Sequence, residues 1–161
     1  MSDPNREPHQ YRCRTVWTGA AQGPTATYES YSREYRVEMP GKPPIVGSSD
    51  VPFGGDGTLP NPEDLLLVAL STCHMLSYLA LCARAGIRVV AYADDAVGSM
   101  TVKQKALRFT DALLRPRVTL AVGSDLAKAE ALHEKAHHGC FIANSVNFPV
   151  RHEALTTIAA H

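Results

Sequence analysis

The stretch NPEDLLLVALSTCHMLSYLALCARAG, residues 61–86, decides the fold. Asn61 is a favourable N-cap residue, Pro62 suits the first helical position, and the two acids that follow stabilise the positive end of a helix dipole. Gly86 suits the position just after a helix, and Arg84 falls in the last turn. We therefore predict a single helix from residue 62 to about residue 85.

This predicted helix is apolar on nearly every face. It is long enough to raise a membrane-spanning interpretation, for which about 20 apolar residues are needed. Its centre, however, carries polar side chains, and a helix that is apolar all round is equally typical of one buried in a protein core. We therefore interpret it as a core helix and expect no membrane association. The polar residues are Ser71, Thr72, His74, Ser77 and Tyr78.

Length and composition are those of an ordinary globular protein. A chain of 161 residues, 45% apolar and 20% charged, predicts one domain over residues 1–161. The net charge is zero and no Lys/Arg cluster occurs, so we expect no nucleic-acid partner. Residues 1–9 are polar and contain proline, which predicts a flexible tail and no secretory signal, and hence a cytoplasmic location.

The remaining segments predict an α+β fold. Before the long helix, Tyr11–Gly19 and Tyr28–Met39 predict two antiparallel strands, and residues 40–60, with five prolines and five glycines, predict a long loop that belongs to the functional site. After the helix we expect three strands between residues 88 and 121. A second helix capped by Ser124 or Asp125 should reach about His138, followed by a short helical piece after Cys140 and a last strand, Phe148–Ile158.

The four cysteines, at positions 13, 73, 82 and 140, are too few and too irregularly spaced for a disulfide framework. Cys73 has apolar neighbours at helical spacing, so the local pattern alone is equally compatible with a small buried side chain and with a reactive thiol. Cys82 lies roughly 180° around the same helix, so the two cannot pair within it. We interpret Cys13 and Cys82 as structural or incidental.

Two segments carry a family resemblance. One is the helix start followed by Ser71-Thr72-Cys73-His74-Met75, and the other is Ala136-His137-His138-Gly139-Cys140 with Asn144 and Ser145 shortly after it. With their spacing and the order of the elements, they resemble the OsmC/Ohr family of osmotically inducible and organic-hydroperoxide-resistance proteins over nearly the whole chain. The resemblance implies an OsmC-like fold, with antiparallel sheets wrapped around long central helices in an intertwined homodimer.

The resemblance also implies a chemistry. It makes Cys73 the peroxidatic thiolate, Cys140 the resolving thiol and Glu63 a carboxylate that holds an active-site arginine. Many relatives carry this arginine in the turn after the first strand; residues 20–24 contain none, so we assign the role to Arg33. The substrates implied are alkyl and lipid hydroperoxides, reduced without a cofactor or metal, and a small dithiol, for example of the lipoyl type, or a reductase restores the thiols. The cycle would run through a sulfenic acid and a disulfide.

Helix geometry bears on this assignment. Glu63 and Cys73 are ten residues apart and therefore about 15 Å apart along one helix. If both act at one site, either the arginine bridges part of the gap or the carboxylate comes from a second subunit whose helix runs antiparallel. We favour the homodimer, because a helix that is apolar on all sides also needs more cover than one small chain provides.

Two alternative functions remain open. His133-Glu134-Lys135-Ala136-His137 matches the H-E-x-x-H zinc pattern, with His138, Cys140 or His152 as a possible third ligand, which would make the protein a zinc-dependent hydrolase. Against it, charged neighbours suggest that this helix face is solvated. The protein could instead be a non-enzymatic binder of a lipid-like ligand. His74 points about 100° away from Cys73 on a helix, so we interpret it as a core or interface histidine and not as a catalytic base.

Overall fold

A computed structural model describes residues 8–160 of the chain. The chain divides into two compact units, residues 1–65 and 66–161. Residues 1–7 of the predicted tail lie outside the described residues, and residues 8 and 9 are exposed and without regular structure. We predicted one domain over residues 1–161, and the structure divides this chain into two compact units.

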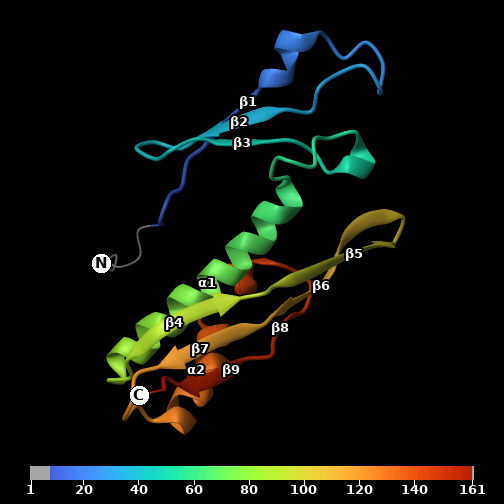
Figure 1. The fold of residues 1–161 in the computed structure, drawn as a ribbon. Helices are drawn as coiled ribbons and strands as arrows, with labels where there is room; N and C mark the ends of the chain where they lie inside the picture. Colours follow the sequence, from blue (N-terminus) through green and yellow to red (C-terminus); the bar gives the residue numbers. More distant parts are fainter. Residues whose placement is uncertain (1–7, 161) are drawn as a thin grey trace, which may run out of the picture. The chain divides into compact units, whose positions relative to one another are not determined.

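The first unit is built on an antiparallel sheet with the strand order β1-β2-β3 (Figure 1). Its strands are β1 (Arg14–Trp17), β2 (Tyr35–Glu38) and β3 (Ile45–Gly47), and short 3-10 helices cover Thr18–Gln22 and Val51–Phe53. The antiparallel pairing predicted for the first two strands is confirmed, although both strands are shorter than expected.

The long loop predicted over residues 40–60 contains one short strand, β3, that the sequence did not indicate. β3 pairs with β2, and Tyr35 is opposite Gly47. A Cβ atom at Gly47 would come within 2.4 Å of the Tyr35 ring, so this glycine makes room for an aromatic side chain. The backbone N–H of Ser48 then donates to the carbonyl of Pro60 at 3.0 Å, which closes the rest of the segment into a compact loop.

The long helix α1 (Pro62–Arg84) has the predicted limits. Asn61 and Asp64 form a reciprocal cap: the Asp64 N–H donates to Asn61 Oδ1 at 2.8 Å, and the Asn61 N–H donates to Asp64 Oδ2 at 3.1 Å. At the other end Gly86 adopts a left-handed φ of 73°, and the Ile87 N–H donates to the Cys82 carbonyl at 2.9 Å. Both ends were predictable because each is specified by a few neighbouring residues.

The second unit holds the remaining strands in two sheets, with the orders β4-β7-β9 and β5-β6-β8. The pairs β4–β7 and β5–β6 are antiparallel, whereas β6–β8 and β7–β9 are parallel, so the predicted α+β fold is confirmed with sheets that are antiparallel in part and mixed as a whole. The strands β8 and β9 follow α2 in the sequence. Because α2 returns the chain along the sheets, these strands can pair in parallel with β6 and β7. The strand bounds are β4 (Val89–Asp94), β5 (Val97–Lys103), β6 (Ala106–Leu114), β7 (Pro116–Leu120), β8 (Val150–His152) and β9 (Leu155–Ile158).

Two strand predictions in this unit need correction. The region 88–121 holds four strands and not three, because a turn at Gln104 and Lys105 separates β5 from β6. The segment 148–158 holds β8 and β9 and not one strand. The second helix, α2 (Leu126–His138), has the predicted limits, and the Asp125 carboxylate caps it by accepting from the Lys128 N–H at 3.0 Å. The short helical piece after Cys140 is a 3-10 turn, Ala143–Ser145.

One face of α1 supplies the core of the second unit. Its buried residues, Leu70, His74, Tyr78 and Cys82, follow a spacing of four. Residues of β7 and α2 pack around Tyr78 and Cys82, and residues of β6 and β8 pack around Leu70. Figure 1 shows α1 running alongside β4 and β7. By length and composition α1 could cross a membrane, and only 22% of its most apolar window is buried within the chain, so the predicted core role holds for one face of the helix. The opposite face is exposed, with Val68 at 55% and Leu76 at 62%.

Candidate active site: two thiols beside a groove

The structure brings Cys73 and Cys140 together. Cys73 is half-buried in the middle of α1, and Cys140, which is 1% exposed, follows Gly139 at the end of α2. The two side chains lie close enough for the Cys73 thiol to raise the pKa of Cys140, and both are free thiols. The only pair of cysteines that the sequence analysis linked is therefore adjacent in space.

Backbone geometry after α2 fixes the position of Cys140. Its N–H donates to the His137 carbonyl at 3.2 Å, and its carbonyl accepts from the Asn144 N–H at 3.1 Å, just before the 3-10 turn Ala143–Ser145. The Ala143 N–H points at Cys140 Sγ at 3.5 Å. Burial raises the pKa of the Cys140 thiol; the Ala143 N–H opposes this shift, and the neighbouring Cys73 thiol adds to it. Cys140 is consequently a protonated thiol at neutral pH.

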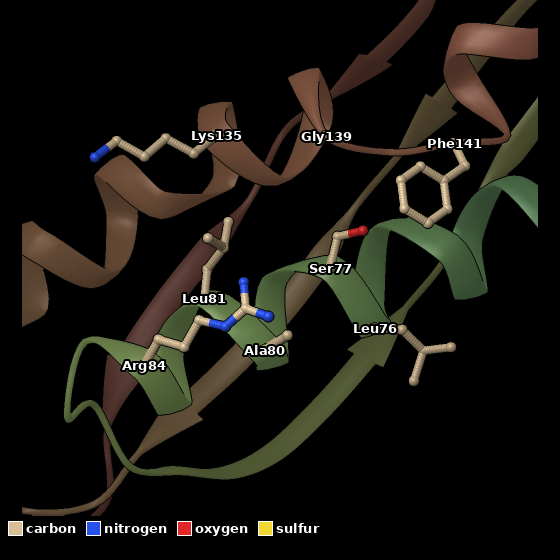
Figure 2. A pocket seen from close by; sticks show the side chains of 8 residues that line it. All are labelled: Leu76, Ser77, Ala80, Leu81, Arg84, Lys135, Gly139 and Phe141. Carbon is tan, nitrogen blue, oxygen red and sulfur yellow. The ribbon is translucent and has the colours of Figure 1, made fainter. Parts of the chain in front are cut away.

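A groove of about 370 Å³ runs between α1 and the end of α2 (Figure 2). Ser77 lies one helical turn beyond Cys73, and Gly139 and Phe141 flank Cys140. Most of the wall is aliphatic or aromatic, and the groove also has two cationic side chains. The lining residues are Leu76, Ser77, Ala80, Leu81, Arg84, Lys135, Gly139 and Phe141.

Arg33, the predicted active-site arginine, lies in the first unit and has local partners. Its guanidinium donates to the carbonyls of Tyr31, at 2.5 Å, and Tyr28. Its Cζ lies 3.9 Å from the centre of the Tyr31 ring and 4.8 Å from that of the Tyr28 ring, which are cation–π distances. A Cβ at Gly54, whose φ is 75°, would lie 2.9 Å from the Arg33 Cζ, so this glycine leaves space for the guanidinium.

Glu63 lies in the first turn of α1 and is half-buried. Burial raises the pKa of the Tyr35 phenol, and the negative charges of Glu63 and Asp64 raise it further, so this carboxylate faces Tyr35. Among the described residues no ion pair joins Glu63 to Arg33. The role assigned to each of them stays a prediction.

The H-E-x-x-H segment contributes to the core. His133 is 1% exposed; its ring stacks on Tyr78 at a centroid distance of 3.8 Å, and its Nδ1 lies 3.2 Å from His74 Nε2. The expectation that this helix face is solvated was therefore wrong for His133. Glu134 is exposed and contacts His152 at 3.3 Å. Within residues 8–160 no group of three or more potential ligands is arranged to hold a metal ion.

His74 is confirmed as a core histidine, since it is fully buried. The predictions missed its pairing with His133, which joins α1 to α2. A signal was available: His74 follows Leu70 and precedes Tyr78 at a spacing of four, and His133 shares one helix face with Ala129 and Ala136. These spacings place both histidines on the buried faces of their helices.

Fold and site together define a class: an α+β protein in which a long apolar helix presents a half-buried thiol to a buried one. Comparison with known proteins places the chain within that class. Residues 55–154 match the family model described as OsmC-like protein, and the chain belongs to this family, as the sequence resemblance predicted.

Solved structures and a curated relative agree. An OsmC-like protein of unknown function from Vibrio cholerae is 31% identical, with a TM-score of 0.84 over 92% of this chain and 100% of its own. An organic hydroperoxide resistance protein OsmC from Legionella pneumophila shares the fold, with a TM-score of 0.66 at 17% identity over 96% of this chain and 100% of its own. The uncharacterized protein YmaD of Bacillus subtilis is 26% identical over 86% of this chain and 87% of its own length.

Proposed function

We propose that the protein is a thiol-dependent peroxidase that reduces organic hydroperoxides, with Cys73 as the peroxidatic and Cys140 as the resolving residue. The observation that carries the proposal is the proximity of two free thiols, one half-buried and one buried. Membership of the OsmC-like family supports it, as does the fold shared with organic hydroperoxide resistance proteins. Fold alone does not fix an activity, so the thiols have to be tested directly.

The proposed reaction balances as follows. The Cys73 thiolate attacks the terminal oxygen of the hydroperoxide, an S–O bond forms and the O–O bond breaks. The alkoxide takes up a proton and leaves as the alcohol, and Cys73 becomes a sulfenic acid. The Cys140 thiol then attacks the Cys73 sulfur, an S–S bond forms and water leaves. The peroxide has gained two electrons and the thiol pair has lost two.

The thiols must then be restored by thiol–disulfide exchange. A small dithiol, for example of the lipoyl type, would reduce the disulfide and become a disulfide itself, so no bound cofactor is required. We assign Arg33 to the stabilisation of the thiolate and the departing alkoxide, and Glu63 to the orientation of Arg33. We place this chemistry in the cytoplasm, where reductants keep resting thiols reduced.

We further propose that the protein acts as a homodimer. The exposed face of α1 carries Val68, Thr72 and Leu76 at a spacing of four, and burying apolar side chains of this size is favourable. A second copy with an antiparallel α1 would cover this face, and it would bring the partner's first helical turn towards the thiols. In this arrangement Glu63 of the second copy would approach the thiols. Glu63 of the same chain lies about 15 Å from Cys73 along α1.

The test is stopped-flow consumption of cumene hydroperoxide by the fully reduced protein, with free thiols counted before and after. We expect rapid reaction, the loss of two thiols per chain, and no fast reaction in Cys73→Ser. Cys13→Ser is the matched control, because Cys13 is an exposed cysteine elsewhere and should leave the rate unchanged. A wild-type rate no faster than that of an ordinary free cysteine would refute the proposal.

The two alternatives predict other results. A zinc-dependent hydrolase would contain bound metal and lose activity with a chelator, but His133 is engaged with His74 and Tyr78. In a non-enzymatic binder of a lipid-like ligand, the thiols would not react with peroxide. The groove beside the thiols suits such a ligand equally well, so only the thiol measurement separates this alternative from the peroxidase.

A further inference from the structure

We propose that Asn144 is a positioning residue for the resolving step, and that it acts by fixing the backbone on both sides of Cys140. The proposal rests on the proposed peroxidase function and deepens it. Asn144 would act through the segment that carries the buried thiol and not on the reacting sulfur atoms themselves.

The first argument is the pair of hydrogen bonds that Asn144 donates. Its side-chain Nδ2 donates to the His138 carbonyl at 2.9 Å, and its backbone N–H donates to the Cys140 carbonyl at 3.1 Å. These two carbonyls enclose the backbone of Gly139 and the Cα of Cys140. One residue therefore holds the chain both before and after the buried thiol.

The second argument is the way in which α2 ends. The last carbonyls of a helix have no partner within the helix and need donors from elsewhere. Gly139, directly after α2, has a φ of −88° and so lacks the left-handed conformation that often terminates a helix. The Asn144 side chain instead caps the His138 carbonyl from six residues further along the chain. The exit of the chain from α2 thus depends on this side chain.

The third argument is the donor that the same turn aims at the sulfur. The Ala143 N–H points at Cys140 Sγ at 3.5 Å, and Ala143 directly precedes Asn144. Burial raises the pKa of the Cys140 thiol, and this N–H opposes the rise. If the Asn144 side chain no longer held the turn, both the position of the sulfur and its activation by Ala143 should be weakened.

The segment also faces the part of α1 that follows Cys73. Gly139 and Phe141, the neighbours of Cys140, line one groove together with Ser77, which lies one helical turn beyond Cys73 (Figure 2). The two thiols come from different elements, so their separation depends on how the chain leaves α2. A misplacement of about 1 Å can slow a reaction up to about 10²-fold.

The two steps of the proposed reaction should respond differently to residue 144. The first step, in which the S–O bond forms and the O–O bond breaks, involves only Cys73 and the peroxide. The second step, in which the S–S bond forms and water leaves, requires Cys140 in place. A change at Asn144 should therefore slow the second step alone.

The test is quenched-flow mass spectrometry of the reduced protein after mixing with cumene hydroperoxide, which separates the sulfenic acid from the disulfide. Asn144→Ala removes the donor, and Asn144→Asp keeps the shape but turns a carboxylate oxygen towards the His138 carbonyl. We expect both to slow disulfide formation about three- to tenfold, as the loss of one exposed hydrogen bond would give, with the attack step unchanged. Asn147→Ala is the matched control, because Asn147 is exposed and lies outside the 3-10 turn, and it should change neither step.

Two further readouts separate positioning from general stability. In a Cys140→Ser background the lifetime of the sulfenic acid should no longer depend on residue 144, because the group that Asn144 positions is gone. In Asn144→Ala the pH profile of disulfide formation should move to higher pH, because the Ala143 N–H would oppose the raised pKa of Cys140 less. A merely structural role would lower the free energy of unfolding and leave this profile in place.

A redox titration with glutathione in a Cys13→Ser background tests the same idea without peroxide. The effective concentration of the Cys140 thiol towards Cys73 should fall in Asn144→Ala by about the factor seen in the kinetics. Equal slowing of both steps, an effect that persists without Cys140, or unchanged disulfide formation in both assays would overturn the proposal. If no hydroperoxide reacts, the peroxidase function fails and the titration alone decides the role of Asn144; if the two thiols form no disulfide in either assay, both proposals fail.

Discussion

The buried contact between His74 and His133 should make the stability of the protein fall with acid. Both side chains are almost fully buried, and their ring nitrogens lie 3.2 Å apart. The pKa of His74 is lowered from 6.5 to about 4. Burial is the main cause, and the neighbouring His152 and His137 contribute to the same shift. Burial and the proximity of His74 lower the pKa of His133 to about 3. Both rings are therefore neutral in the folded protein at physiological pH.

The sign of the effect follows from proton binding. Between pH 6.5 and pH 4 the unfolded chain protonates His74 and the folded chain does not, so acid favours the unfolded state. The shift of His74 corresponds to about 3 kcal/mol of unfolding free energy, which is fully present above pH 6.5 and lost by about pH 4. His133 adds to this loss, but not additively, because the two rings share one hydrogen bond. Glu134 also faces the cluster through its contact with His152; burial lowers the pKa of His137, and the charge of Glu134 raises it.

The assay is urea unfolding at fixed protein concentration and ionic strength, at several pH values from 7.5 to 4.5, for wild type, His74→Leu and His138→Gln. We expect the free energy of unfolding of wild type to fall steeply below pH 6.5 and that of His74→Leu to fall less, whatever its absolute stability. His138→Gln is the control, because His138 is exposed. Parallel pH profiles for wild type and His74→Leu would refute the reasoning.

Three further predictions concern the thiols, the dimer and the helix cap. Cys140→Ser should let the sulfenic acid on Cys73 persist, so dimedone should label the peroxide-treated variant and not wild type, and equal labelling would remove the resolving role. Val68→Lys should weaken the proposed dimer in light-scattering measurements, whereas Val102→Lys, on an exposed site of β5, should not; a monomeric wild type contradicts this. Asn61→Ala should cost about 1 kcal/mol in urea unfolding through loss of the N-cap, and an unchanged midpoint would show that the cap does not contribute.

The parts of the fold predicted from sequence were those with local causes. Both helices have the expected limits because Asn61, Gly86 and Asp125 act on backbone groups within a few residues. The turn at Gln104 and Lys105 was missed because both residues adopt a positive φ, of 53° and 65°, without the glycine or asparagine that normally marks it. The parallel pairing of β6 with β8 depends on contacts between distant segments and has no local signal.

The candidate site was predictable to a smaller extent. Composition and spacing left Cys73 equally compatible with a packing role, and only the family resemblance linked it to Cys140; the proximity of the two follows from the approach of α1 to the end of α2. Arg33 was chosen because residues 20–24 contain no arginine, and its local partners could not be anticipated. The H-E-x-x-H spacing is visible in the sequence. Spacing alone, however, does not indicate that His133 is buried or where its side chain points.

The different exposure of the two thiols matches the order of the proposed reaction. A peroxidatic thiol has to be reached by substrate, and half-buried Cys73 lies one turn from an open groove. A resolving thiol has to meet the sulfenic acid quickly while avoiding peroxide itself. Burial protects Cys140 and, by raising its pKa, keeps it from being the more reactive thiolate, while its proximity to Cys73 shortens the path between the two sulfurs. The packing of α1 against α2 thus gives Cys73 and Cys140, which have the same side chain, different roles in the proposed reaction. If the exposures of the two thiols were exchanged, these roles would be lost.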